Sequence, residues 1–466
     1  MENSQNILQR FALRVSDWSE KWFPDSYIFA LLGVVIVAIA SISIGAPAKD
    51  VAVSFGDGFW SLIPFTLQMC MLIVVGYVVS VSKPVELLIQ KMARIPHSGR
   101  GAIVLVATVS LLISLINWAM STVLTALLVI ALAKRKELNM DYRAAAAAAI
   151  IGMGATWALG ISSSAAQLQA NKSSLPESIY NLTGVIPFTE TIFLPQSMIM
   201  TAVLIIASIA IAFWSAPKGQ DIKTIDQFSI QFEEETKPTA TTKRPGDWLE
   251  NSPLLSILIV LLGLVWMFNE FSKSNPILAI SSLNTYNFIF LMLGIALHGT
   301  PRNFLNAVNK AVSGVLIQFP LYGSIAFMMT QALNSHDLSL SHYIAEFFVS
   351  IASKETFAIV MGLYSAILGF FIPSGGGKWI IEAPYVMQAA HDLKVHLGWS
   401  VQIYNAAEAL PNLINPFFML PMLGILKLKA KDVIGFTVTQ LVFHLPLVLF
   451  LLWILGRSLT YMPPTF

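Results

Sequence analysis

A glycine-rich break between two short apolar runs constrains the fold of this chain more than any other feature. The break extends over Ile372–Trp379 and contains three successive glycines, and the apolar runs on its two sides cover residues 357–371 and 379–390. Neither run reaches the roughly 20 residues that a helix needs to cross a bilayer. The pattern therefore predicts a re-entrant hairpin with its tip inside the membrane. Irregular backbone at that depth needs protein or water as its hydrogen-bond partner, so the tip should line a cavity.

The predicted tip is a candidate anion site. Glycines leave backbone N–H groups free to converge on one point, and the N-terminus of the second arm adds the positive end of its dipole. The alternative is a plain glycine kink in a spanning helix, which would turn Lys378 toward lipid at a cost of about 2.5 to 3.5 kcal/mol or more. On the hairpin interpretation we expect the substrate to contact Ser374, Gly375, Gly376, Gly377, Lys378 and Trp379.

The composition indicates a polytopic membrane protein. Of the 466 residues 56% are hydrophobic and 12% charged, and the mean hydropathy is +0.69, which leaves too few charges to coat a water-soluble globule of this size. The net charge of +2 gives no reason to expect a nucleic-acid partner. The single cysteine, Cys70, excludes an intrachain disulfide and a cysteine-based metal site. The first apolar run, Tyr27–Ile44, is longer than the core of a signal peptide, so we expect it to stay as a span.

The pattern of apolar runs predicts an all-α protein with nine transmembrane helices and two re-entrant hairpins. The expected domains are an interfacial amphipathic N-terminus at 1–26, a first repeat at 27–214, a cytoplasmic linker at 215–252 and a second repeat at 253–466. The linker is rich in charged residues, threonine and proline and has few large apolar side chains. The expected spans lie near 27–44, 60–81, 144–169, 192–214, 254–271, 286–297, 312–332, 401–423 and 433–455.

The first part of the chain contains a counterpart of the glycine hairpin and of the broken helix that follows it. Residues 101–133 are apolar for 33 residues with one main interruption at Asn117, which predicts another hairpin with its tip there. Each hairpin precedes a helix with a polar break, at Gly160–Ser164 in the first part and at Pro411–Pro416 in the second. Asn117 and Lys378 are equivalent at an offset of 261 residues. Inverted repeats with broken helices near the midplane are typical of secondary transporters.

The distribution of lysine and arginine supports one orientation. With the N-terminus in the cytoplasm, 21 of the 28 basic residues fall on the inside, six fall on the outside and Lys378 lies within the membrane. This asymmetry is what the positive-inside rule expects. The C-terminus is then periplasmic.

Three ionisable residues within apolar segments are candidates for binding or coupling. Lys378 and Glu382 are four residues apart, so on a helix they share a face, and they form either a structural ion pair or part of a binding site. Glu408 has apolar neighbours, and the resulting desolvation favours its protonated form. It is therefore the best candidate for a proton carrier. The alternative is a carboxyl group hydrogen-bonded to the backbone freed around Pro411.

Neutral polar residues mark the other breaks. Hydroxyls before a restarting helix can cap it while the helix dipole attracts an anion, although serines within helices more often bond their own backbone. Side-chain and unwound backbone oxygens are common Na⁺ ligands in transporters. We expect further substrate contacts at Asn117, Trp118, Ser162, Ser163 and Ser164, and coupling-ion contacts at Glu382, Asn405, Glu408, Asn412 and Asn415.

At several of these positions the sequence resembles that of the bacterial short-chain fatty acid transporter family. The resemblance rests on Trp22–Asp25, Gly56–Trp60, Ile116–Trp118, Pro373–Gly377 with Trp379, and Glu408 with Asn412 and Pro416–Phe417. It implies uptake of short monocarboxylates such as butyrate or acetoacetate across the bacterial inner membrane, in a fold of elevator carriers that commonly form homodimers. Lys378 and Glu382 depart from the neutral side chains expected in the family pattern, which puts the substrate and coupling ion in question.

The sequence thus predicts a secondary carrier that grips one carboxylate, with H⁺ or Na⁺ as the coupling ion and no other cofactor. One cation already near a glutamate favours a monocarboxylate, while a dicarboxylate or other organic-anion carrier of the same fold is the alternative. A membrane-embedded enzyme has little support because the chain has no HExxH motif, no convincing cysteine nucleophile and no histidine beside a serine at a break. No catalytic or metal-binding residues are expected.

Overall fold

The computed structural model describes residues 26–172, 174–228, 230, 246–273, 276–311, 315–371 and 375–464. Within these ranges the chain is helical, no strand forms, and one isolated bridge joins Leu333 to Ser339. The predicted interfacial segment at 1–26 lies, except for its last residue, outside the described residues, and so does Ser374.

The first part of the chain begins several helices with side-chain caps. Ser98, Asn117, Asp141 and Ser163 each accept a hydrogen bond from a backbone N–H three residues later. Such a cap stabilises a helix by about 1 kcal/mol. The helices are α2 (Ser26–Ser43), α3 (Ala48–Ser61), α4 (Ile63–Ser80), α5 (Lys83–Met92), α6 (Gly99–Ser114), α7 (Trp118–Ala133), α8 (Tyr142–Ala155), α9 (Ser164–Gln169), α10 (Glu177–Thr183) and α11 (Pro195–Ser215).

The second part of the chain is also a series of helices, several of which contain an internal proline that removes a backbone hydrogen bond. Among these prolines are Pro320 in α17, Pro384 in α20 and Pro446 in α23. The helices are α12 (Asp247–Asn251), α13 (Leu254–Lys273), α14 (Pro276–Ser281), α15 (Leu283–His298), α16 (Pro301–Lys310), α17 (Val315–Thr330), α18 (Leu340–Ile351), α19 (Phe357–Phe371), α20 (Gly375–Asp392), α21 (Leu397–Ala409), α22 (Pro416–Leu426) and α23 (Ala430–Gly456).

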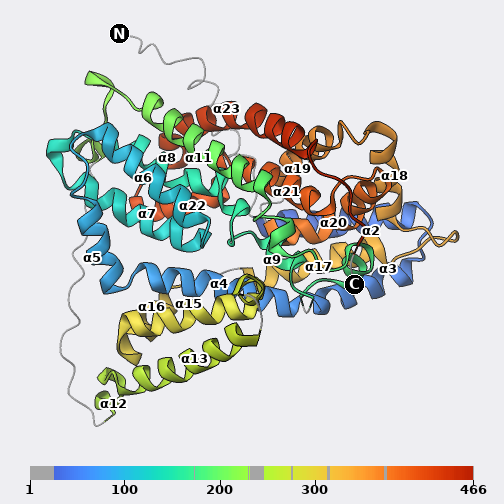
Figure 1. Cartoon of the computed structure of the whole chain (residues 1–466), viewed down its shortest axis with the longest axis horizontal. Helices are drawn as coiled ribbons and strands as arrows, with labels where there is room; N and C mark the ends of the chain where they lie inside the picture. The colour runs from blue at the N-terminus through green and yellow to red at the C-terminus, as the bar shows by residue number, and fades with distance from the viewer. Residues whose placement is uncertain are drawn as a thin grey trace.

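The helices form two groups that lie side by side (Figure 1). In one group α17 packs on α2 and α3, and α15 packs on α4 and α13. In the other group α6 packs on α7 and α8, α11 packs on α23, and α19 packs on α21. Contacts of α4 with α7 and of α17 with α20 join the two groups. The second group contains the residues predicted to form the site.

Each predicted hairpin region contains two helices that follow one another in the chain. The first is α6 with α7, and the second is α19 with α20; they lie toward opposite ends of the molecule (Figure 1). The arms of the first pack directly against each other, whereas α19 packs mainly on α21.

The predicted span near 60–81 corresponds to α4, and a separate helix, α3, ends just before it and crosses α17 closely. The helix stops at Leu62, between α3 and α4, where Pro64 in the first turn of α4 starts a new helix. Gly58 of α3 and Gly323 of α17 lie so close that a side chain on either would collide with the backbone of the other. Beside them the Ser324 hydroxyl donates to the Phe55 carbonyl at 2.8 Å. Small residues of this kind let two membrane helices approach closely.

Part of the predicted linker packs on the beginning of α8. The backbone N–H of Tyr142 donates to the carbonyl of Lys223 at 2.8 Å, and the N–H of Lys223 donates to a carboxylate oxygen of Asp141 at 2.9 Å. The ring of Phe228 lies against that of Tyr142, with centroids 6.1 Å apart. Residues 222–228 are thus held against this helix, although their composition predicts a solvated linker.

Among the described residues, five helical segments are long and apolar enough to cross a membrane. They are Ile63–Ser80, Tyr142–Gln169, Pro195–Ser215, Leu254–Lys273 and Ala430–Gly456. Shorter apolar helices include both arms of the first hairpin and α19. The number of nine spans stays a prediction.

Candidate functional site

The two broken helices cross each other at their breaks. After α8 the chain forms a single turn, η2 (Trp157–Leu159), before α9, and after α21 it forms η6 (Leu410–Leu413) before α22. The hydroxyl of Ser163 donates to Oδ1 of Asn405 at 3.1 Å. Nδ2 of Asn412 donates to the carbonyl of Met153 at 3.1 Å. Each break therefore supplies partners for polar groups of the other helix, as irregular backbone inside a membrane protein requires.

The tip of the first hairpin is attached to the first break. The backbone N–H of Trp118 donates to the hydroxyl of Ser162 at 2.9 Å, and the N–H of Ser162 donates to the carbonyl of Leu115 at 3.1 Å. Asn117 is completely buried, and its side-chain oxygen caps α7 by accepting from the N–H of Met120 at 2.8 Å. The predicted tip residue thus lies inside the protein.

The second hairpin reaches the same break with its glycines. Gly375–Gly377 form the first turn of α20 and are buried. The hydroxyl of Tyr404 donates to the carbonyl of Gly375 at 2.5 Å. A methyl group on Gly376 would lie 2.6 Å from the ring of Phe65 and 3.1 Å from Cβ of Ser164, so a larger residue there would have to displace the Phe65 ring. Both hairpins therefore meet at Ser162–Ser164.

A buried ion pair lies one turn into α20. Nζ of Lys378 is 2.6 Å from Oε1 of Glu382, and both side chains are completely buried. The Ser365 hydroxyl of α19 donates to Oε2 of Glu382 at 2.5 Å, and Nζ of Lys378 also donates to the carbonyl of Ser365 at 3.1 Å. The same Nζ lies 4.3 Å from the centre of the Tyr404 ring. The ion pair that the spacing predicted is confirmed, and α19 and α21 complete its surroundings.

Glu408 is a buried carboxyl group next to this pair. It is fully buried, and within the described part of the chain neither of its side-chain oxygens has a hydrogen-bond partner. A methyl group on Gly369 would lie 3.3 Å from the backbone carbonyl oxygen of Glu408 and 3.5 Å from Cε of Lys378. These two atoms are therefore less than 7 Å apart. The alternative in which the carboxyl bonds the backbone near Pro411 is not what the structure shows. An unpaired buried carboxyl group is able to take up a proton or a cation.

Several other residues expected at the site have structural partners. Asn405 donates to Oε1 of Gln402 at 2.7 Å, and Asn415 donates to the carbonyl of Phe370 at 3.1 Å. The indole N–H of Trp379 donates to Oε1 of Gln169 at 3.3 Å. Within the described residues no group of three or more His, Cys, Asp and Glu side chains is placed to hold a metal ion.

Sequence reasoning missed three residues of the site. Phe65 comes from α4 and packs against Gly376, and Ser365 comes from α19, the other arm of the second hairpin, and bonds to the ion pair. Tyr404 could have been found, because it precedes Glu408 by four residues and so lies one helical turn away.

The arrangement of hairpins and broken helices agrees with the comparison to known families. The profile described as short chain fatty acid transporter matches residues 7–455. The chain belongs to the short-chain fatty acid transporter family. A relative from Escherichia coli K12 is 32% identical over 443 residues, covering 94% of this chain and 97% of that protein. One from Haemophilus influenzae Rd is 31% identical over 453 residues, covering 95% and 98%. Both carry the provisional name short-chain fatty acid transporter.

Solved structures show that the fold of this family member is one found in transporters. The YdaH transporter of Alcanivorax borkumensis superposes with a TM-score of 0.56 at 14% identity, covering 93% of this chain and 98% of that one. MtrF of Neisseria gonorrhoeae, described as illuminating a class of antimetabolite efflux pumps, gives a TM-score of 0.54 at 13% identity, covering 97% and 98%. The predicted membership of the family is confirmed, and the protein is a membrane transporter.

Proposed function

We propose that this family member is a secondary active carrier of short monocarboxylates such as butyrate and acetoacetate, which it takes up across the bacterial inner membrane together with H⁺ or Na⁺. The observation that carries the proposal is the position of Glu408. A buried carboxyl group without a hydrogen-bond partner among the described residues lies beside the Lys378–Glu382 pair, where both hairpins and both broken helices converge.

The surroundings of Gly375–Gly377 favour a small anion with a single charge. The N–H groups of the first turn of α20 and its dipole attract a carboxylate. Lys378 is already paired with Glu382 at 2.6 Å, so it adds little net positive charge for a second carboxylate. The rings of Phe65 and Trp157 lie against Gly376 and Gly375 and provide an apolar wall for a short alkyl chain. A dicarboxylate or other organic-anion carrier is the alternative.

Two coupling schemes are compatible with these residues. Protonation of Glu408 during uptake of a monocarboxylate would make the cycle electroneutral. Na⁺ coupling would instead use the oxygens of Asn405, Asn412, Asn415 and the serines at the first break.

The order of elements supports an elevator carrier built from two inverted repeats. A short hairpin, a broken helix and a long helix follow one another as α6 to α11 and again as α19 to α23. Paired hairpins that enter from opposite faces allow one group of helices to move against the other. We expect a homodimer, with the helix group that contains α2, α3, α4, α13, α15 and α17 at its centre.

Uptake by purified protein in liposomes, with Na⁺ and proton gradients imposed in turn, tests the proposal. Butyrate and acetoacetate should accumulate under one of the two gradients, and succinate under neither. Counterflow should exchange labelled for unlabelled butyrate without chemical change. Accumulation of succinate alone would favour the alternative carrier, and conversion of the label into a new compound would show an enzyme.

A substitution at the glycine hairpin tests the position of the substrate. Gly376→Val should abolish butyrate binding, because its side chain would lie against Phe65 and Ser164 where Cβ alone comes within 2.6 Å of the ring. Gly424→Val in α22 is the matched control, since a Cβ there meets nothing within 4 Å. Binding is measured by calorimetry on the purified variants. Wild-type affinity in Gly376→Val would place the substrate elsewhere.

A further inference from the structure

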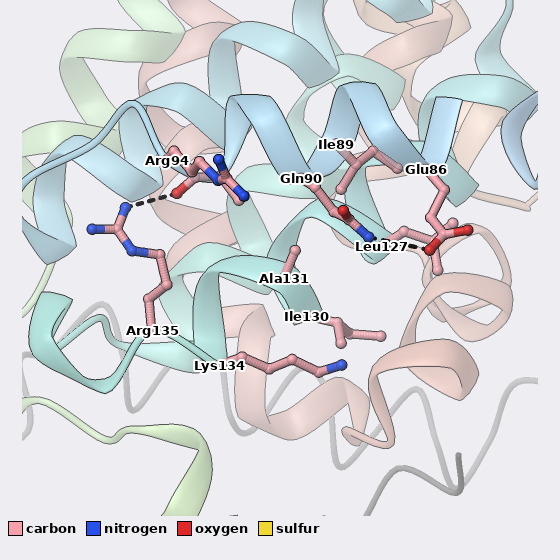
Figure 2. Close-up of a pocket in the computed structure, with 10 residues that line it drawn as sticks. Glu86, Ile89, Gln90, Arg94, Leu127, Ile130, Ala131, Lys134 and Arg135 are labelled. Atoms are coloured by element: carbon pink, nitrogen blue, oxygen red, sulfur yellow. Dashed lines mark hydrogen bonds between the residues drawn. The ribbon is translucent and has the colours of Figure 1, made fainter. Parts of the chain in front are cut away.

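A cavity of about 460 Å³ lies between α5 and α7, away from the site described above (Figure 2). Its size is within the range of small-molecule sites. Its walls come from α5 and the turn after it, and from α7 and the residues after that helix. The lining residues are Glu86, Ile89, Gln90, Ala93, Arg94, Leu127, Ile130, Ala131, Lys134 and Arg135.

The polar part of the cavity is positive. Glu86 is paired with Lys83 at 2.8 Å on the exposed surface, and Arg135 is paired with Glu137 at 2.7 Å. Arg135 is also fixed by a hydrogen bond of 2.8 Å to the carbonyl of Ala93, which Figure 2 shows. Arg94 and Lys134 have no ion-pair partner among the residues that the structure describes. Two cations are therefore available to a ligand.

The rest of the cavity is apolar and continues onto a lipid-facing surface. Ile89 is buried on the inner face of α5, and Leu127 and Ile130 border the cavity from α7. On the outer face of α5, Leu87 and Leu88 are 48% and 50% exposed. In a membrane protein we expect such side chains to contact acyl chains. Arg94 and Lys134 would then lie at the level where lipid head groups meet the hydrocarbon.

We propose that this cavity binds an anionic glycerophospholipid. Its phosphate binds Arg94, which offers two parallel donors to phosphate oxygens, Lys134 adds a second positive charge to the lining, and an acyl chain covers Ile89, Leu127 and Ile130. The apolar half of the lining distinguishes this ligand from a free anion, which would leave those side chains uncovered. A zwitterionic lipid would place a quaternary ammonium group next to two cations and bind more weakly.

The place of the cavity in the fold gives the lipid a role. α5 packs on α4 and α15 of one helix group and on α7 of the other. α7 is the second arm of the first hairpin, and its other end bonds to Ser162 at the site. A lipid held between α5 and α7 therefore connects the two helix groups. This inference does not depend on the proposed substrate.

Native mass spectrometry of the detergent-purified chain tests the proposal, with phosphatidylglycerol and phosphatidylcholine of identical acyl chains as probes. Wild type should retain phosphatidylglycerol at least about tenfold better than phosphatidylcholine, as expected from charge-assisted bonds to phosphate. The double variant Arg94→Gln/Lys134→Gln should lose this preference. Lys91→Gln/Lys136→Gln is the control, because it removes two nearby exposed charges that do not line the cavity.

Thermal unfolding separates the outcomes further. Phosphatidylglycerol should raise the Tm of wild type and of the control but not of the double variant, whereas Arg94→Lys should keep only part of the effect, because it keeps the charge but loses the two parallel donors. Equal retention of both lipids by wild type, or an unchanged preference in the double variant, overturns the proposal. Stabilisation by inorganic phosphate equal to that by phosphatidylglycerol would show a site for free anions instead.

Discussion

The two hairpins occupy equivalent places in the chain but are held by different chemistry. The first has a neutral tip, where Asn117 caps α7 and Trp118 bonds to Ser162, and its two arms pack on each other. The arms of the second make less contact, and a buried ion pair between Lys378 and Glu382 connects α20 to Ser365 of α19. One hairpin is fixed by neutral hydrogen bonds and the other by charges.

The difference indicates which hairpin is able to respond to ions. Neutral hydrogen bonds between fixed partners do not change with the proton or Na⁺ concentration. A buried ion pair with a further carboxyl group nearby has several charge states of different energy. We therefore expect the second hairpin to sense the coupling ion and the first to provide a rigid wall.

The largest predicted effect comes from removing one member of the ion pair. Glu382→Gln leaves the Lys378 ammonium buried without its partner, and such losses cost about 3 to 5 kcal/mol. We expect a large fall in Tm, measured by thermal unfolding in detergent. The double variant Lys378→Met/Glu382→Gln is the control and should recover much of the lost stability. An unchanged Tm in Glu382→Gln would mean that the pair does not hold the second hairpin.

The second-largest predicted effect is on the coupling of transport to protons. Glu408→Gln keeps the shape of the side chain but removes its ability to exchange a proton. Uptake driven by a pH gradient should fall by a factor of ten or more, while butyrate binding remains. The measurements are uptake in liposomes and calorimetry on the same preparation. Asn117→Gln is the comparison at the neutral hairpin, and it should leave the ratio of proton-driven to exchange transport unchanged. Unaltered proton-driven uptake in Glu408→Gln would remove this residue as the proton carrier.

A smaller effect is expected at the neutral tip. Asn117→Ala removes the cap of α7, which should lower the free energy of unfolding by about 1 kcal/mol. Asn117→Ser keeps an oxygen that is able to cap and should restore part of the loss. Chemical unfolding of the three proteins measures the difference. A loss as large as that in Glu382→Gln would show that the two tips are held equally strongly.

The residues that cap the two broken helices also differ. Asp141 caps α8 by accepting from the N–H of Ala144 at 2.9 Å. His396 caps α21 by accepting from the N–H of Trp399 at 3.1 Å, and its other ring nitrogen lies 3.2 Å from Glu190. His396 lies in the turn before α21, where burial lowers its pKa although Glu190 acts in the opposite direction.

The smallest predicted effect is a pH dependence at His396. Because its pKa is lower in the folded chain, the unfolded chain binds more protons, and stability is lost as the pH falls through about 6.5. His396→Asn keeps a side-chain acceptor for the cap but does not titrate. Between pH 8 and 5.5 the wild type should lose up to about 1 kcal/mol more than this variant, the scale of a single cap. Parallel pH profiles of Tm would show that His396 does not contribute.

Prediction from the sequence succeeded where a local pattern carried the information. The tip at Asn117, the break at Gly160–Ser164 and the Lys378–Glu382 pair all follow from a few neighbouring residues. It did not predict α3 (Ala48–Ser61), because Lys49, Asp50, Asp57 and two glycines interrupt the apolar residues of that helix. It also missed Ser365 and Phe65, because nothing near them in the chain indicates a charged or glycine partner.

The sequence alone determined that this is a helical membrane protein with polar interruptions, because apolar run length and intramembrane charge are properties of short segments that the bilayer selects directly. Only the tertiary structure decided that Ser162–Ser164 join both hairpins and that Glu408 lies beside Lys378. These contacts link segments more than 200 residues apart or on different helices, so their geometry depends on how whole helices pack.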